Sequence, residues 1–160
     1  MRRLRVVAVL AALVVVPLLA CSPAELLGRS DLGRYVAAMR APLAEFTTWA
    51  QDVLAFYGDV LRLREIDGIC STGRLNDLIA RGEGSIGRLR AVPPPSAVSS
   101  LHDAVADGGD KTLANLRQVR ELLCERRDLA RAQEAVEQAQ SALRDLSSLL
   151  ESLRERLPDL

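Results

Sequence analysis

The chain has 160 residues, of which 49% are hydrophobic, and its 21 basic and 21 acidic residues give a formal net charge of zero. This balance argues against nucleic acid as a partner, because a nucleic-acid-binding surface needs a basic patch. The only histidine is His102, which excludes zinc sites built from several histidines.

The first 20 residues have the order of a secretory signal. Arg2, Arg3 and Arg5 are followed by an uninterrupted apolar run over residues 6–20, and then by Cys21. Charge, apolar core and a small residue before a cleavage point are typical of a signal peptide. The run is shorter than the roughly 20 residues of a membrane-spanning helix, and it contains a proline. We therefore predict that residues 1–20 are removed.

The end of this segment, Leu18-Leu19-Ala20-Cys21, resembles the lipobox of bacterial lipoproteins. The resemblance implies that the Cys21 thiol receives a diacylglyceryl group and that the signal is cut just before it. Two acyl chains anchor a protein stably, whereas one chain binds a bilayer only marginally. We expect a protein anchored to the cell membrane on its extracytoplasmic side, or to an outer membrane where there is one. The alternative is an uncleaved anchor with an ordinary buried Cys21.

The chain after the signal is predicted to be one helical domain behind a flexible tether, residues 21–30. Three basic residues precede Cys21, so the chain from Cys21 onward has 18 basic and 21 acidic residues and a net charge of −3. Good helix formers dominate its composition. No stretch shows the alternation of β-branched residues that marks a strand. The domain should therefore be all-α.

A first helix is predicted over residues 31–66. Its phase continues through Pro42, so we expect a kink there, or a fresh start near residue 41, rather than a loop. Glu45, Asp52 and Asp59 recur every seven residues off the apolar face and are interpreted as a solvated surface. The apolar positions follow helical spacing: Val36, Met39, Leu43, Phe46, Ala50, Val53, Tyr57 and Val60.

An aromatic stripe lies on this helix, which carries all five aromatic residues of the chain. Phe46, Trp49 and Phe56 recur at helical spacing, which is usually core filling. The alternative is a groove for an apolar ligand or a partner helix. Trp49 would then be the anchor, because tryptophan is common at binding hot spots.

The second and third helices are predicted over residues 71–92 and 96–124. Ser71 and Ser96 are suitable N-caps, and three prolines at 93–95 separate the two helices. The pair Gly108-Gly109 is expected to interrupt the third helix, with Asp110 able to start its second half. Glycines at 82, 84 and 87 weaken the second, each by up to about 1 kcal/mol relative to alanine.

The fourth helix, residues 128–157, has the clearest pattern. Asp128 is the expected N-cap and Pro158 the stop. Short connections between long helices make neighbours antiparallel, which predicts an up-down-up-down four-helix bundle over residues 31–158. The apolar positions alternate by three and four, as in a left-handed packed helix: Leu129, Ala132, Val136, Ala139, Leu143, Leu146, Leu150, Leu153 and Leu157.

Cys70 and Cys124 are predicted to form a disulfide. In this topology the first connection and the end of the third helix lie at the same end of the bundle. An extracytoplasmic compartment permits disulfides. The alternative is two free buried thiols. A metal site would need more ligands, and no histidine is close to either cysteine in sequence.

No residue pattern predicts catalysis or a cofactor. His102 is interpreted as a surface or rim residue. A pair with Met39 could ligate haem iron, but Met39 lies on the packing seam and no Cys-x-x-Cys-His motif exists. Paired carboxylates, phosphate-binding glycine loops and nucleophile elbows are also missing from the sequence. We therefore expect no enzyme, no metal and no cofactor.

The expected function is that of a non-catalytic envelope lipoprotein. It would bind the membrane through the lipid on Cys21 and have a protein partner in the envelope. The short tether predicts that the start of the first helix, residues 93–95 and the chain end face the membrane. Partners would then meet residues 66–72 and 124–128. The alternative function is a carrier of an apolar ligand or cofactor in a pocket near Trp49 and Phe56.

Overall fold

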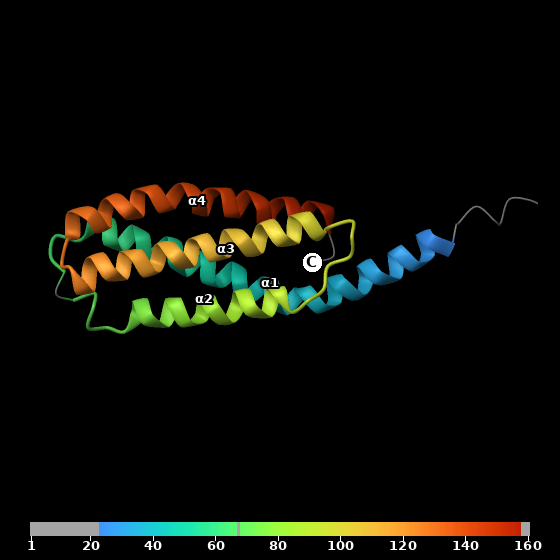
Figure 1. The fold of residues 1–160 in the computed structure, drawn as a ribbon, viewed down its shortest axis with the longest axis horizontal. Coiled ribbons are helices and arrows are strands. Elements are labelled where there is room, and N and C mark those ends of the chain that lie inside the picture. The colour runs from blue at the N-terminus through green and yellow to red at the C-terminus, as the bar shows by residue number, and fades with distance from the viewer. Residues whose placement is uncertain (1–22, 67, 158–160) are drawn as a thin grey trace, which may run out of the picture.

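The computed structural model describes residues 23–66 and 68–157. Within this part the chain forms four α-helices, a single π-helical turn and no strand, which confirms the predicted all-α bundle (Figure 1). No helix in it is long and apolar enough to cross a membrane. The signal and Cys21 lie outside the described residues. The elements are α1 (Pro23–Arg62), α2 (Arg74–Arg90), α3 (Ser99–Arg120), the π-helix η1 (Glu121–Glu125) and α4 (Leu129–Arg156).

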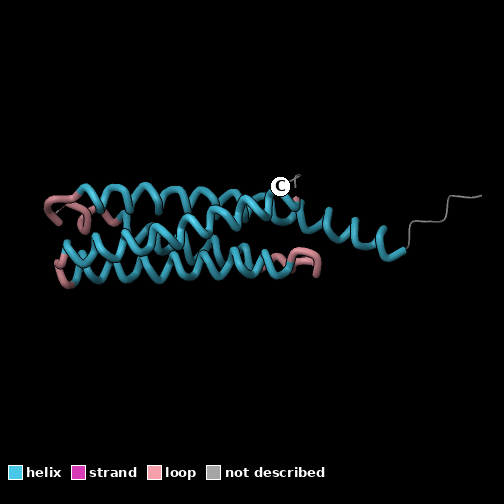
Figure 2. The backbone as a smooth tube through the Cα atoms, turned by 90° about the horizontal axis from the view of Figure 1, so that it is seen from above, coloured by secondary structure: helices cyan, strands magenta, loops and turns pink. Residues whose placement is uncertain are grey.

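Each helix packs against its neighbours in a closed ring, since α1 contacts α2 and α4, and α3 contacts α2 and α4. Figures 1 and 2 show the four helices lying side by side along one axis, with α1 extending beyond the others at its N-terminal end. The apolar seams of all four helices line the interior. Burying these seams is what stabilises the bundle, because a single helix of this length is marginal in water.

Three ion pairs join α1 to α2 and show the register between the two helices. Glu45, Asp52 and Asp59 each accept a hydrogen bond of 2.7 Å from an arginine of α2: Arg88, Arg81 and Arg74 in that order. Residue numbers rise along α1 as they fall along α2, so the two helices run antiparallel. The acidic row predicted to be a solvated face is therefore an inter-helix row of ion pairs. Its side chains stay about half exposed, and exposed pairs contribute little to stability.

The ends of α1 differ from the prediction. The helix begins at Pro23, so residues 23–30 of the expected tether are helical. It is continuous through Pro42, so the chain forms no loop there, as predicted, and does not start afresh near residue 41. It ends at Arg62 rather than at residue 66, and the Gln133 side chain of α4 donates to the carbonyls of Val60, Leu61 and Leu63 at 3.1, 3.4 and 3.2 Å. This amide satisfies acceptors that the end of a helix leaves free.

The predicted serine caps of α2 and α3 are wrong. The N-cap of α2 is Gly73, with φ 69°, and the Ser71 hydroxyl donates instead to the carbonyl of Gly68 at 3.0 Å. A turn in the left-handed region favours glycine, so the turn geometry decides where α2 starts. Helix α3 begins at Ser99, after an N-cap at Val98. In α4, by contrast, the Asp128 carboxylate accepts from the Arg131 N–H at 3.1 Å, as predicted.

Gly108 and Gly109 do not interrupt α3, which is continuous from Ser99 to Arg120. A Cβ atom on Gly109 would lie 2.8 Å from the Phe46 ring, and one on Gly108 would lie 2.9 Å from Leu146. These glycines are therefore places where large side chains of α1 and α4 reach the backbone of α3. The expected break was wrong because close packing between helices offsets the low helix propensity of glycine.

We expect Gly109→Ala to lower the free energy of unfolding by about 1–3 kcal/mol, because the added methyl group overpacks the core against Phe46. The matched control is Gly87→Ala in α2, where nothing lies within 4 Å of the added Cβ. That variant should gain about 0.5–1 kcal/mol from helix propensity alone. Urea denaturation measures both, and a gain for Gly109→Ala would contradict this packing.

Candidate functional site

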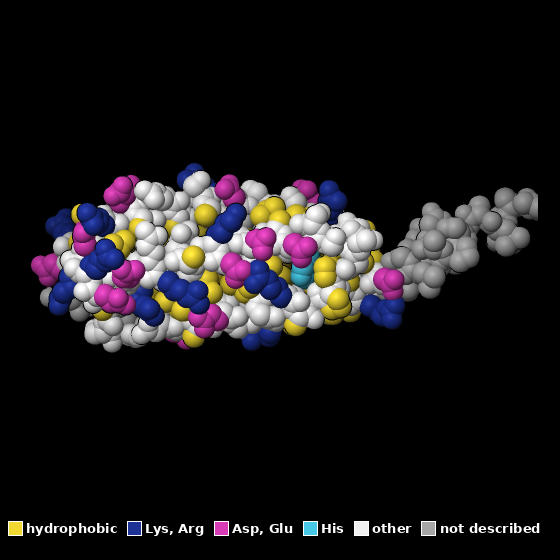
Figure 3. Space-filling model, in the orientation of Figure 1, with side chains coloured by type: hydrophobic (Ala, Val, Ile, Leu, Met, Phe, Trp, Pro, Cys, Tyr) yellow, Lys and Arg dark blue, Asp and Glu magenta, His cyan; other side chains and the backbone are white. Residues whose placement is uncertain are grey.

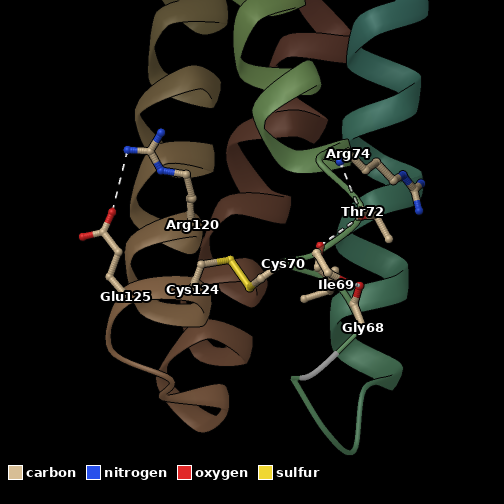
Figure 4. Close-up of a disulfide and its surroundings, with 9 residues drawn as sticks. Gly68, Ile69, Cys70, Thr72, Arg74, Arg120, Cys124 and Glu125 are labelled. Carbon is tan, nitrogen blue, oxygen red and sulfur yellow. Dashed lines mark hydrogen bonds and ion pairs between the residues drawn. A yellow bond between two sulfur atoms is a disulfide. The ribbon is translucent and has the colours of Figure 1, made fainter.

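Cys70 and Cys124 form a disulfide, as predicted, with Cα atoms 5.6 Å apart. Cys70 lies in the loop between α1 and α2, and Cys124 lies in η1 (Figure 4). The α1–α2 loop and η1, which carry the pair, lie at the end of the bundle opposite to the projecting start of α1 (Figure 1). We call the loop 63–73 together with residues 121–128 the disulfide end.

A cleft of about 90 Å³ opens beside this disulfide. Arg120 at its wall lies 3.9 Å from the carboxylate of Glu125, so the charge of the cleft is balanced. No group of three or more metal-ligating side chains occurs in the described chain. The residues that line the cleft are Cys70, Gly73, Leu75, Asn76, Arg120, Cys124 and Glu125.

The backbone at the disulfide end departs from regular helix. In η1 the Arg126 N–H donates to the carbonyl of Glu121 at 2.9 Å, five residues back. Arg127 has φ 53°, the left-handed region that non-glycine residues rarely adopt. Single π-helical turns are frequent at functional sites. No sequence signal indicated this turn, because the apolar spacing of α3 continues into it.

The aromatic stripe lies inside the core. Phe46 and Phe56 have no exposed surface, and Trp49 is 1% exposed. The Trp49 indole N–H donates to the carbonyl of Leu78 in α2 at 2.8 Å. A Cβ atom on Gly82 would lie only 2.7 Å from the Trp49 ring, so the ring packs directly on the backbone of α2. These three rings fill space between helices and present no surface to a partner in this structure.

The sequence indicated a surface or rim position for His102. The structure shows that this is wrong, because His102 is only 2% exposed. Its Nδ1 lies 2.9 Å from the hydroxyl of Tyr35 on α1, a buried hydrogen bond at the end of the bundle where α1 projects. Burial lowers the pKa of His102, and Arg90 lowers it further while Asp103 opposes this. Burial also raises the pKa of Tyr35 to about 12. Met39, the other half of the haem alternative, is fully buried.

This buried histidine predicts a pH dependence of stability. The folded pKa of His102 is below its ordinary value of 6.5, so the unfolded chain takes up the proton first. The stabilisation is present above pH 6.5 and is lost as the pH falls from there towards the folded pKa. We expect His102→Gln, which keeps a hydrogen-bonding group for Tyr35, to weaken the dependence. Urea denaturation at pH 7.5 and 5.5 measures the free energy of unfolding of both proteins. The prediction would be refuted if this free energy fell by the same amount between the two pH values in the wild type and the variant.

The surface between the two ends carries no field of one sign on the face seen in Figure 3, where basic and acidic side chains are interspersed. Several of them pair between helices, such as Arg117 with Glu83 at 2.6 Å and Arg90 with Asp110 at 2.5 Å. No family model, curated protein or solved structure matches the chain. The disulfide end, with its cleft and irregular backbone, is therefore our candidate site.

Proposed function

We propose that this protein is a non-catalytic envelope lipoprotein that presents the disulfide end to a protein partner. The observation that carries the proposal is the lipobox-like sequence Leu18-Leu19-Ala20-Cys21, which stands just before the start of α1 at Pro23. Lipid on Cys21 would attach the chain to the membrane at the projecting end of α1. The partner would then meet the opposite end of the bundle.

The shape of the bundle supports this orientation. Helix α1 has 40 residues and α4 has 28, and α4 spans about 42 Å at 1.5 Å per residue. An anchor at the start of α1 would therefore hold the disulfide end well away from the bilayer. That end carries the cleft beside Cys70 and Cys124, whereas the aromatic stripe is buried.

The anchor is tested by labelling cells with a radiolabelled fatty acid. The wild-type protein should carry the label, and Cys21→Ala should not, because the thiol is the acceptor. Cys70→Ser/Cys124→Ser is the control and should stay labelled, since the disulfide plays no part in lipidation. A wild-type protein without label would refute the proposed anchor.

The orientation is tested with two matched exposed alanines, Ala97 in the α2–α3 turn and Ala130 at the start of α4. Each alanine is replaced by cysteine and labelled with a fluorophore, and the lipidated protein is placed in vesicles with acceptor-labelled headgroups. We expect stronger energy transfer from position 97 than from position 130. Equal or reversed transfer would contradict a bundle that points its disulfide end away from the bilayer.

The partner is tested by photo-cross-linking in intact cells. A photoreactive residue at the exposed Asn76, in the wall of the cleft, should give an adduct with one envelope protein. The same residue at Ala97 is the control and should not give that adduct. Adducts from Ala97 alone, or from neither position, would contradict partner binding at the disulfide end.

A further inference from the structure

The loop between α1 and α2 is held to the rest of the bundle chiefly by the disulfide. None of its described residues, 64–66 and 68–73, is buried. The hydrogen bonds of the Ser71 and Thr72 side chains are local. Thr72 Oγ1 donates to the carbonyl of Ile69 at 3.1 Å (Figure 4), and Ser71 Oγ donates to the carbonyl of Gly68 at 3.0 Å. Among its described residues, Ile66 and Ile69 add half-buried apolar contacts with the core.

The two cysteines differ in how firmly their surroundings hold them. Cys124 follows directly after Leu122 and Leu123, which are 8% and 0% exposed and belong to the core. Cys70 is exposed and has no buried neighbour in the described part of its loop. Breaking the link would therefore leave Cys124 in place and release the Cys70 side, because loops with few buried contacts open at low free energy.

The disulfide is also open to reagents from solvent. Cys70 is exposed and Cys124 half-buried, and both line the cleft of about 90 Å³. Thiol–disulfide exchange requires that a thiolate reach one of the two sulfur atoms. The cleft and the exposure of Cys70 provide that access, whereas a structural disulfide inside a core would be shielded.

We propose that the Cys70–Cys124 disulfide is a reversible latch, opened from solvent by a dithiol reductant, which frees the described loop residues 64–66 and 68–73 without unfolding the bundle. One thiolate of the dithiol attacks one sulfur of the pair, which breaks the Cys70–Cys124 bond, releases the other cysteine as a thiolate and forms a mixed disulfide. Its second thiol then displaces the protein thiolate and closes the reductant's own disulfide. Cys70 and Cys124 receive the two protons and two electrons, and end as thiols. The latch does not depend on lipid at Cys21.

The structure sets limits to the freed segment on both sides. On the α1 side, Gln133 donates to the carbonyls of Val60, Leu61 and Leu63. On the α2 side, Leu75 is 3% exposed and packs in the core. The motion should therefore stop near residues 63 and 74, and the helices beyond should keep their packing.

Hydrogen exchange with mass spectrometry tests the latch on the purified oxidised protein, with and without dithiothreitol. Reduction should speed exchange in residues 64–73 by about tenfold or more, and reoxidation should restore it. The α2–α3 turn, residues 91–98, is the internal control and should not change. Cys70→Ser/Cys124→Ser should exchange fast in this segment with or without dithiothreitol.

Three outcomes would overturn the latch. Unchanged exchange in residues 64–73 after reduction would show that other contacts hold the loop. Exchange in α1 and α4 as fast as in the freed loop would show that the disulfide holds the whole bundle. Resistance of the wild-type disulfide to dithiothreitol under native conditions would show that its sulfur atoms are not accessible. Since none of these readouts involves the lipid, failure here and failure of the proposed anchor are separate results.

Discussion

Trp49→Ala should lower the free energy of unfolding by about 3–5 kcal/mol, the usual cost of removing a large aromatic side chain from a core. Trp49 is 1% exposed, and its indole N–H donates to the carbonyl of Leu78 at 2.8 Å. Its ring occupies the space that Gly82 leaves by having no side chain. Gly82 has no side chain that could move into the cavity left by the Trp49 ring, so the surrounding structure should relax little.

Two further variants separate the causes of this loss. Trp49→Phe keeps most of the apolar volume but removes the indole N–H, so it should cost less than Trp49→Ala. Leu54→Ala is the matched control on the same helix, because Leu54 is 51% exposed, and a surface change of this kind is usually within about 0.5 kcal/mol. Urea denaturation measures all three. A loss for Trp49→Ala no larger than that of the control would contradict the buried position.

The second large effect concerns the disulfide. Cys70→Ser/Cys124→Ser should lower the free energy of unfolding by about 4 kcal/mol, because the cross-link restricts an unfolded chain over a sequence separation of 54 residues. This loss arises in the unfolded state. It is therefore compatible with a folded bundle that loosens only at residues 64–73 when the link opens.

The same experiment has a control in the wild-type protein. Wild type denatured in the presence of dithiothreitol should lose about as much stability as the double variant. The double variant itself should not respond to dithiothreitol. If the double variant and the oxidised wild type had equal unfolding free energies, the disulfide would add no net stability, and strain or residual structure would cancel its entropic effect.

Several features of the fold follow from the sequence by itself, and they share a local cause. The spacing of apolar residues placed the first and fourth helices, since each helix must bury one stripe along its own length, and the three prolines at 93–95 separated the second from the third. The phase of the first helix predicted that no loop forms at Pro42, and α1 runs through this residue. Asp128 was recognised as a cap because its carboxylate bonds to a backbone N–H only three residues on. The order of the helices also placed Cys70 and Cys124 at one end.

Other features were decided only by the tertiary structure. Gly109 lies in an uninterrupted helix because Phe46 packs against it, and His102 is buried because Tyr35 of another helix covers it. Asp52 belongs to an ion pair because Arg81 arrives opposite it. In each case the deciding atom belongs to a different helix. For the two hydrogen-bonded pairs it lies 29 and 67 residues away in the chain. The periodicity of one helix specifies which side is buried, whereas the register between helices specifies what that side meets.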